Sequence, residues 1–409
     1  MKKVKNYPCK FFKTVLLIII LTCLTNCQLV STPVSTPTPV ILAEPTKDEI
    51  LNRTIIPVNS EFFVSETGSD DGPGTQAAPW HSIQKAADSM ASGNSVTVLP
   101  GDYPEFVTIE HSNLSFKAGG LVRMKGFLIN GENNLVKGFT ITSPGSNFGI
   151  RVIGNNNRIE NNDISNTSQD GIWFFGSGSI FSGNKIHDIV DRSKITTDPH
   201  VDCFQTWGPA ENIIFEKNIC DHTNTFGSNQ ITQISNVNQP VKDITFRNNL
   251  FIMHDPGYSP MTFYHMDGKP DITNIVVANN TFVHVNGIGT AGIWFRNISS
   301  AIVVNNLFID FGDQSSSYLL TDGSRDIQIS SNVVYKTDHV VPAGGMLSND
   351  TWLPDPGLVD EKLLNFRPAP YSALVDKGMD ASQWVSDDFD GTPRPQGKGF
   401  DIGAFEYKP

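Results

Sequence analysis

A short alternating segment that ends in Asn recurs seven times along the chain. In every copy an apolar residue follows two positions after the Asn, and the copies end at Asn162, Asn184, Asn218, Asn249, Asn280, Asn306 and Asn332. The successive spacings are 22, 34, 31, 31, 26 and 26 residues. Such a period predicts a solenoid, built from coils of about 22 residues whose turns accept insertions.

Each copy alternates apolar and polar residues, which predicts a short strand with one buried face. The repeated Asn suits a corner between strands, because Asn tolerates left-handed backbone and its amide can bond to neighbouring backbone. In stacked coils it can also bond to the Asn above and below. We therefore expect these Asn residues to form structural ladders without a catalytic role.

A second strand precedes each Asn segment. The copies read Gly149–Val152, Gly171–Phe175, Cys203–Trp207, Ile231–Ile234, Met261–His265, Gly292–Arg296 and Tyr318–Asp322. Their outward positions carry large or polar groups. We expect function on this strand.

Gly-Ile-x-Val followed by the Asn-Asn-x-Ile corner resembles the repeat of right-handed parallel β-helix proteins of the pectin-lyase-like kind, over about residues 60–340. The opening at residues 63–103 is similar to the entry of such helices, where a short amphipathic helix, here residues 82–90, covers the first coil. Residues 388–395 and 400–407 resemble the C-terminal segment called choice-of-anchor Q. The resemblance implies an all-β fold but no single reaction, since this fold hosts lyases, hydrolases, epimerases, esterases and adhesins.

The chain divides into four predicted regions. Residues 1–27 combine five lysines with an apolar run and read as a secretory signal, in which Leu24 to Cys27 is similar to a lipoprotein box that would lipidate Cys27. Residues 28–58 are a Thr/Pro-rich linker, residues 59–345 the β-helix and residues 346–409 an irregular C-terminal cap. We expect a monomeric bacterial lipoprotein at the cell surface or in the periplasm, with simple secretion as the alternative.

The net charge of −12 argues against nucleic acid as a partner and requires a local basic group or a bridging cation for any acidic glycan. Cys203 and Cys220 are too few for a disulfide framework, so we expect both to pack as small residues.

The second strands also predict a substrate groove. Aligned on their following glycines, Asp170–Gly176 and Asp202–Gly208 should lie one coil apart, with Asp170 near Asp202 and Trp173 near Gln205. The candidate polysaccharide-binding residues are Arg151, Trp173, Gln205, Trp207, Tyr264, Trp294 and Arg296. Aromatic rings stack on sugar faces, while arginine and amide groups bond to carboxylates and hydroxyls.

A charged insertion before Asp202 supplies candidate catalytic residues, namely Arg192, Lys194, Asp198 and His200. Asp198-Pro-His200 resembles the Asp-Pro-His-Asp motif of mannuronan epimerases, although Val201 intervenes before Asp202. Proton abstraction beside a uronate carboxyl needs a base and a neutralising group. His200 is the candidate base, with Lys194 as a competitor and Arg151 or Arg192 as neutraliser, for β-elimination or epimerisation.

Two other functions stay open. Asp170 and Asp202 could act as a hydrolytic pair, since Asp170-Gly171 and Asp202-Cys203 look similar to segments of pectin-degrading hydrolases. A non-catalytic adhesin or glycan-binding protein is the third hypothesis. Calcium is a candidate cofactor, held by Asp188 and Asp191 with Asp202 or by the acidic clusters at residues 69–72 and 387–391.

Overall fold

The computed structural model describes residues 60–142, 148–168, 170–189, 200–223, 228–236, 239–253, 261–265, 272–285, 291–311, 318–336 and 346–409. The predicted signal, Cys27 and the linker lie outside these residues. Among the residues described, no helix is both long and apolar enough to cross a membrane.

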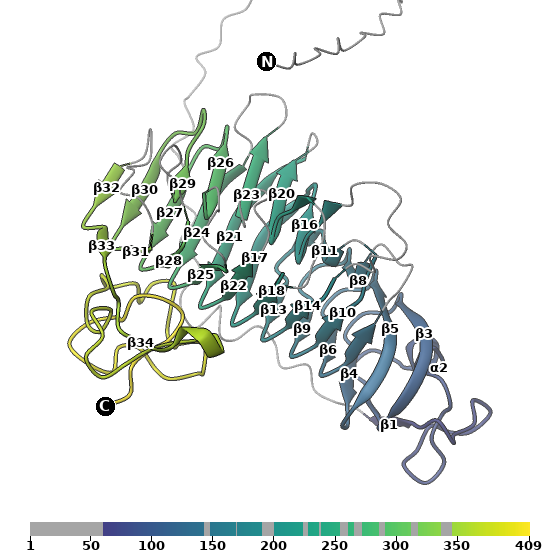
Figure 1. Ribbon diagram of the computed structural model, residues 1–409. Coiled ribbons are helices and arrows are strands. Elements are labelled where there is room, and N and C mark those ends of the chain that lie inside the picture. Colours follow the sequence, from purple (N-terminus) through teal and green to yellow (C-terminus); the bar gives the residue numbers. More distant parts are fainter. Residues whose placement is uncertain are drawn as a thin grey trace, which may run out of the picture. The chain divides into compact units, whose positions relative to one another are not determined.

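Three ladders of parallel strands form the faces of a solenoid (Figure 1). Face A comprises β1 (Glu61–Val64), β2 (Ser95–Val98), β4 (Ser115–Ala118), β6 (Leu135–Lys137), β9 (Arg158–Glu160), β13 (Ile180–Ser182), β17 (Ala210–Glu216), β21 (Val241–Arg247), β24 (Ile272–Ala278), β27 (Ala301–Val304), β30 (Ile327–Ser330) and β32 (Met346–Ser348), with β12 (Gly176–Ser177) paired beside β17.

Faces B and C complete each coil. Face B comprises β7 (Thr140–Thr142), β10 (Asp163–Ser165), β14 (Lys185–His187), β18 (Ile219–Asp221), β22 (Leu250–Met253), β25 (Thr281–His284), β28 (Leu307–Ile309), β31 (Val333–Tyr335) and β33 (Thr351–Leu353). Face C comprises β3 (Gly101–Ile109), β5 (Val122–Ile129), β8 (Phe148–Val152), β11 (Asp170–Phe174), β16 (Phe204–Thr206), β20 (Thr232–Asn236), β23 (Met261–His265), β26 (Ile293–Arg296) and β29 (Leu319–Leu320). The long strand β5 pairs with both β7 and β8 and so joins the two faces.

The predicted repeat is confirmed, since every Asn segment enters face A and every second strand enters face C. The strands β32 and β33 pair in parallel with β30 and β31, so the ladder continues to Leu353, beyond the predicted boundary at residue 345. Inward positions carry stacked aromatic rings, as in Phe181, Phe215 and Phe246, whose neighbouring centroids lie 4.9 and 4.5 Å apart. These stacks fill the tube with apolar groups.

The Asn ladder runs along the corner between faces A and B, as predicted. The amide of Asn162 donates to Oδ1 of Asn184 at 3.0 Å, and the same bond repeats along the ladder to Asn332. Asp350 continues the ladder by accepting from Asn332. The left-handed backbone, however, falls one residue earlier than predicted, as at Asn161 (φ 53°) and Asn248 (φ 54°). The ladder Asn itself is buried, and its side chain satisfies backbone groups of the preceding coil, as Asn184 does for the N–H of Asn162 and the carbonyl of Ile159.

The N-terminal end carries the predicted short helix, α2 (Ile83–Ser89). The hydroxyl of Ser82 caps it by accepting from Lys85 N–H, and the carboxylate of Glu105 accepts from the backbone N–H groups of Ile83 and Gln84. Ile83, Ala86 and Ala87 are buried in the core of the first coil.

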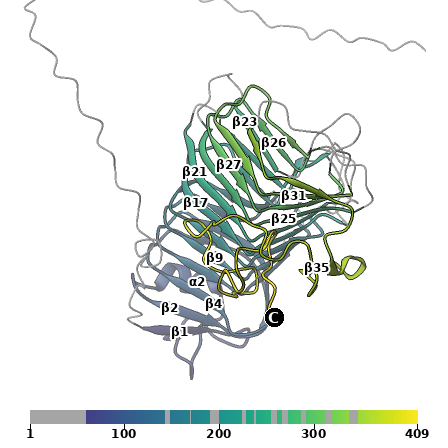
Figure 2. The same cartoon turned by 90° about the vertical axis from the view of Figure 1, so that its left-hand side faces the viewer.

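Residues 354–409 are mostly irregular, with a short antiparallel pair, β34 (Leu358–Asp360) and β35 (Asn365–Pro368), around the 3-10 turn η2 (Glu361–Leu363). Figure 2 shows this segment, in yellow, against the side of the coils. Its apolar residues Phe366, Leu374, Ile402 and Phe405 pack on outward residues of face B. Its centre is the buried Arg394, which pairs with Glu406 at 3.0 Å and donates to the carbonyls of Asp401 and Gly403.

Candidate functional site

The outward residues of face C form one column along the solenoid. The register pairs Arg151 with Trp173 and Trp173 with Gln205, as the sequence alignment predicts. The same column continues through Gln233, Thr262 and Trp294. We call these six residues the outer column. Its amides approach each other, since Nε2 of Gln205 lies 3.4 Å from Oε1 of Gln233.

Aromatic rings form a band beside the first part of the outer column. Phe148 lies 5.5 Å from Trp173, and Trp173 lies 5.6 Å from Trp207, measured between ring centroids. Phe106 continues the band beyond Phe148 at 5.6 Å. Trp207 keeps 46% of its surface exposed, which makes it one of the few exposed large apolar residues. A band of this kind suits stacking against the apolar faces of sugar rings.

The guanidinium of Arg151 lies against this band. Its central carbon is 5.9 Å from the ring centroid of Phe148, 5.4 Å from that of Trp173 and 5.3 Å from that of Phe175. Its Nε is buried and has no hydrogen-bond acceptor among the residues that the structure describes. Aromatic contacts stabilise the cation without neutralising it. Arg151 can therefore bind the carboxylate of a ligand with its planar, two-pronged edge.

A second arginine repeats this arrangement farther along face C. Tyr264 pairs with Arg296 in the register, and the guanidinium of Arg296 lies 4.5 Å from the ring of Tyr264 and 4.6 Å from that of Trp294. The indole of Trp294 also donates to Asp322 at 2.8 Å. The three groups predicted to extend the groove are thus brought together. Five strand steps separate β8 from β26, which places the two arginines on the order of 24 Å apart.

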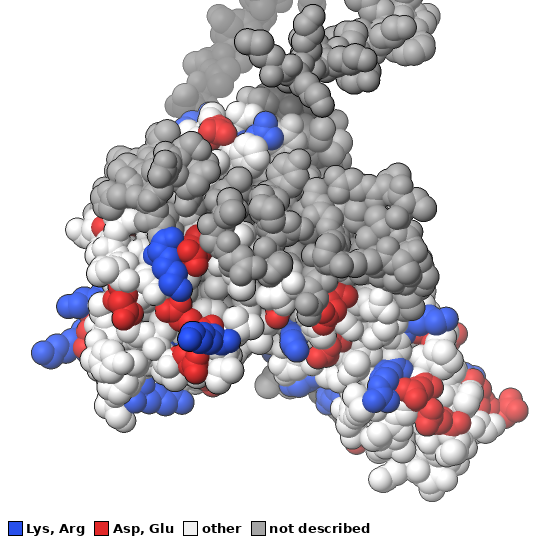
Figure 3. Space-filling view, in the orientation of Figure 1, with Lys and Arg blue, Asp and Glu red and all other residues white. Residues whose placement is uncertain are grey.

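Basic groups do not gather into a patch on the face of the protein that Figure 3 shows. Where Figure 3 is not grey, Lys and Arg lie beside Asp and Glu over the visible surface. Local cations such as Arg151 are therefore the groups able to attract an anionic ligand to an acidic protein.

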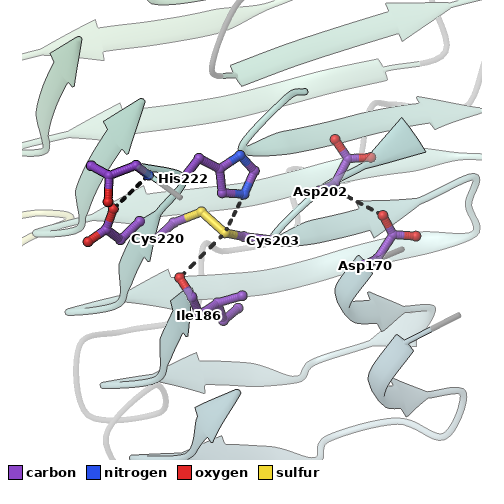
Figure 4. The surroundings of a disulfide bond; sticks show 8 residues. Asp170, Ile186, Asp202, Cys203, Cys220 and His222 are labelled. Carbon is purple, nitrogen blue, oxygen red and sulfur yellow. Dashed lines mark hydrogen bonds between the residues drawn. A yellow bond between two sulfur atoms is a disulfide. The ribbon is translucent and has the colours of Figure 1, made fainter. Parts of the chain in front are cut away.

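Asp170 and Asp202 lie on neighbouring coils, as predicted, and both are buried. The backbone N–H of Asp202 donates to Oδ1 of Asp170 at 2.9 Å (Figure 4), and the indole N–H of Trp173 donates to Oδ2 of Asp170. The amide of Gln205 donates to Oδ2 of Asp202 at 3.2 Å. Asp170 therefore orients the side chain of Trp173 and the backbone of the next coil.

The charged insertion falls mainly beyond what the structure describes. Arg192, Lys194, Asp198 and Asp191 lie outside the described residues, and of His200 the structure describes the backbone. That backbone forms β15 (His200–Val201), which pairs in parallel with β19 (Ser228–Asn229). The insertion thus rejoins the solenoid directly before Asp202, at the start of a face C strand.

Cys203 and Cys220 form a disulfide, so their interpretation as separate packing residues is wrong. The bond joins the start of the face C strand β16 to the face B strand β18 (Figure 4). Nε2 of the buried His222 lies 3.3 Å from Sγ of Cys203, and burial lowers the pKa of His222 to about 3. This is the one group of three possible metal ligands among the described residues, and the disulfide leaves neither sulfur as the thiolate that metals bind.

The described acidic groups proposed for calcium already bond to protein groups. Oδ2 of Asp188 lies 2.5 Å from Nδ1 of His187, whose Nε2 lies 2.9 Å from Asp163 on face B. The hydrogen bond to Asp163 raises the pKa of His187, burial partly opposes this effect, and the hydrogen bond to Asp188 adds to it.

Carboxylates of the two acidic clusters, residues 69–72 and 387–391, also accept hydrogen bonds from the protein. In the first, Asp70 accepts hydrogen bonds from the backbone of His81 and Ser82. In the second, Asp388 accepts from Thr392 and Glu406. These bonds use part of the hydrogen-bonding capacity of the two carboxylates.

The sequence matches no family model and no curated protein. Solved structures share the fold. A pectate lyase, Pel9A, is 16% identical, with a TM-score of 0.56 over 86% of this chain and 98% of its own. The fold is therefore the right-handed parallel β-helix.

Two further structures are similar to a comparable degree. A rhamnogalacturonan lyase is 14% identical, with a TM-score of 0.54 over 74% of this chain and 91% of its own. A glycoside hydrolase is 9% identical, with a TM-score of 0.53 over 71% of this chain and 96% of its own. At such identities the likeness establishes the fold alone.

Two features of the site escaped the sequence analysis. Gln233 occupies the position of Gln205 one coil later, and extending the strand alignment to Ile231–Ile234 would have found it. The 17-residue separation of the cysteines is shorter than one coil, which places them on different faces near one corner. That spacing was the available signal for the disulfide.

Proposed function

We propose that this protein is a polysaccharide-active enzyme that acts outside the cell on a uronate-containing glycan, as a lyase or an epimerase. The observation that carries this proposal is Arg151, whose guanidinium lies against three aromatic rings and whose buried Nε has no hydrogen-bond acceptor among the described residues. A sugar that stacks on this band would place its carboxylate within reach of that cation.

The chemistry follows from that anchor. A base removes the proton on the carbon beside the carboxylate, while Arg151 stabilises the negative charge that develops there. In a lyase the electron pair then forms a double bond and expels the neighbouring glycosidic oxygen. In an epimerase the carbon is reprotonated from the opposite side. His200 is our candidate base, assisted by Asp198, with Lys194 and Arg192 as the alternative base and neutraliser.

Hydrolysis by Asp170 and Asp202 is less well supported. Both oxygens of Asp170 accept hydrogen bonds from Asp202 and Trp173, and only 1% of Asp170 is exposed. A catalytic carboxylate needs an oxygen available to the substrate.

We also propose export of the chain and attachment through a lipid at Cys27, with residues 28–58 as a tether. The Cys203–Cys220 disulfide supports export, because disulfides persist in oxidising compartments outside the cytoplasm.

The test is ultraviolet absorbance of the unsaturated product while purified protein is incubated with alginate, pectate and glycosaminoglycans, with and without Ca²⁺. We expect His200→Ala to lower the rate at least a hundredfold and Arg151→Gln to lower it chiefly through a raised KM. Matched controls are His111→Ala and Arg158→Gln, which alter an exposed histidine and an arginine of face A.

Three other results of these assays would contradict the lyase reaction. Release of reducing ends without absorbance, lost in Asp202→Asn, would favour the hydrolase. An exchanged proton at the sugar carbon without either signal would favour the epimerase. If the glycans bind but undergo none of these changes, the enzyme proposal fails and a binding protein remains.

A further inference from the structure

A cavity of about 600 Å³ lies between face B and the C-terminal segment, and none of the outer-column residues lines it. Its inner wall is made by the ends of β25, β28 and β31, and its outer wall by β34, η2 and β35. The volume lies within the range of small-ligand sites. The cavity contains no residue of the proposed active site.

The rim of the cavity gathers exposed apolar side chains. Of the described residues, only eight large hydrophobic ones are exposed, and four of these lie between residues 359 and 371, namely Val359, Leu363, Leu364 and Tyr371. Tyr371 is 82% exposed and lines the cavity. Such a concentration on one short segment is typical of a surface that contacts a ligand.

The walls carry more negative than positive charge. The cavity is lined by Asp310, Asp355, Asp360 and Glu361, but by only two cations, Lys336 and Lys362. Most of these carboxylates already bond to protein groups. Glu361 pairs with Lys336 at 2.6 Å, Asp360 accepts from two backbone N–H groups of η2, and Asp355 accepts from Gly357.

Asp310 differs from the other three. Its carboxylate has no hydrogen-bond donor among the described residues, although it is partly buried in the wall. Burial raises the pKa of Asp310, and Lys336 only partly offsets this effect. An acceptor in this state is best satisfied by hydroxyl groups of a ligand.

From these features we infer that the cavity is a second carbohydrate-binding site, for a neutral sugar unit that stacks on Tyr371 and donates its hydroxyl hydrogens to Asp310. A uronate is disfavoured, because the wall already holds more carboxylates than cations. The site would hold the protein on the neutral parts of a glycan, whatever reaction face C performs.

The experiment measures binding of hexasaccharides of glucose, mannose, xylose and galactose, with a galacturonate hexasaccharide as the charged counterpart. It uses calorimetry and the His200→Ala protein, so that no substrate is consumed and failure of the proposed reaction does not affect the result. We expect at least one neutral hexasaccharide to bind, and Tyr371→Ala to weaken that binding about tenfold. Leu121→Ala, at an exposed apolar residue outside both the cavity and the aromatic band, is the matched control and should leave it unchanged.

A second variant tests the charge argument. Asp310 has a left-handed backbone (φ 62°), which Asn tolerates, so Asp310→Asn should fold normally. We expect it to change neutral binding less than threefold, because the amide oxygen still accepts, and to raise binding of the galacturonate hexasaccharide in the cavity. Asp326→Asn, at an exposed left-handed position of the face A corner, is the control.

Three results would overturn the inference. The first is that no neutral hexasaccharide binds at millimolar concentration. The second is that a neutral hexasaccharide binds but Tyr371→Ala leaves its affinity unchanged. The third is that the galacturonate hexasaccharide binds in the cavity as tightly as a neutral one. Thermal melts of Tyr371→Ala and Asp310→Asn exclude misfolding as the cause of a loss.

Discussion

Faces B and C belong to the same coils, but their outward residues differ in kind. On face B the outward positions from β18 onward are mostly apolar, as at Ile219, Leu250, Ile252 and Leu307, and the C-terminal segment covers them. On face C the outer column carries arginine, tryptophan and glutamine. The C-terminal segment therefore buries the apolar part of face B. Among the described residues, no segment packs over the aromatic band of face C in the same way.

The earlier coils of face B support this interpretation. There the outward residues are Thr140, Asp163 and Lys185, and the C-terminal segment does not pack on them. The same face thus changes from polar to apolar at the coil where the cover begins. Where Thr281 interrupts the apolar part, its hydroxyl accepts from Ala404 N–H of the cover at 3.0 Å. The C-terminal segment and face B are thus complementary even at a single polar position, as in the well-packed core of an interface.

Arg394→Met should produce the largest change, because it weakens the cover of face B. Arg394 and Glu406 are both buried, so the substitution leaves an unpaired charge and removes donors to two carbonyls. We expect a loss of about 3–5 kcal/mol in the free energy of unfolding, measured with urea. Arg123→Met, which alters the exposed pair with Asp102, should cost under about 1 kcal/mol. Equal losses would mean that the cover contributes no more than a surface contact.

Replacing both cysteines by Ser tests how the two faces are held together, because the disulfide joins β18 of face B to the start of β16 in face C. Loss of the cross-link should lower the free energy of unfolding by about 3 kcal/mol. Since the candidate base His200 lies three residues before Cys203, we also expect a larger proportional loss in kcat than in substrate affinity. A variant that keeps full kcat would show that the corner holds its shape without the bond.

The pH dependence of stability should report on the same corner. His222 is buried and its pKa falls from 6.5 to about 3 on folding, so the unfolded chain binds a proton that the folded chain does not. The contribution of His222 to the free energy of unfolding is fully present above about pH 6.5. It declines as the pH falls below that value, by up to about 1.4 kcal/mol per pH unit. His222→Phe should abolish this slope between about pH 6 and 4.5.

His187 on face B contributes with the opposite sign. Its pKa is raised, so its stabilisation is present at low pH and is lost as the pH rises through the folded-state pKa. If stability still declines below pH 6 in His222→Phe but no longer does so in His187→Ala, the decline does not come from His222 and our assignment of it to that residue is wrong.

The outer column could be predicted from the sequence because two local rules determine it. Alternation decides which residues face outward, and stacking of equal strands decides which of them are neighbours, so Arg151, Trp173 and Gln205 follow from an alignment of strands. The Asn ladder follows from the same rules.

Other features depend on contacts between distant parts of the chain. The packing of the C-terminal segment on face B joins distant residues, such as Ala404 and Thr281, which are 123 positions apart, and no periodicity encodes it. The role of Asp170 also needed the structure, since the same Asp-Gly dipeptide fits a hydrolytic acid and a buried acceptor of the Trp173 indole. Sequence patterns thus indicate which residues line face C, and the hydrogen bonds indicate which carboxylates remain available to a ligand.

Trp207→Ala should have the smallest effect on stability and so gives the sharpest test of the difference between the faces. Nearly half of its surface is exposed, so its removal should change the free energy of unfolding by under about 0.5 kcal/mol. Its ring continues the band from Trp173, and we expect affinity for the substrate glycan to fall about tenfold in a binding titration. Met379→Ala, at an exposed apolar residue of the C-terminal segment that does not line the cavity, should leave both quantities unchanged. A large loss of stability without a loss of affinity would mean that the band is packed structure, and face C would then resemble face B.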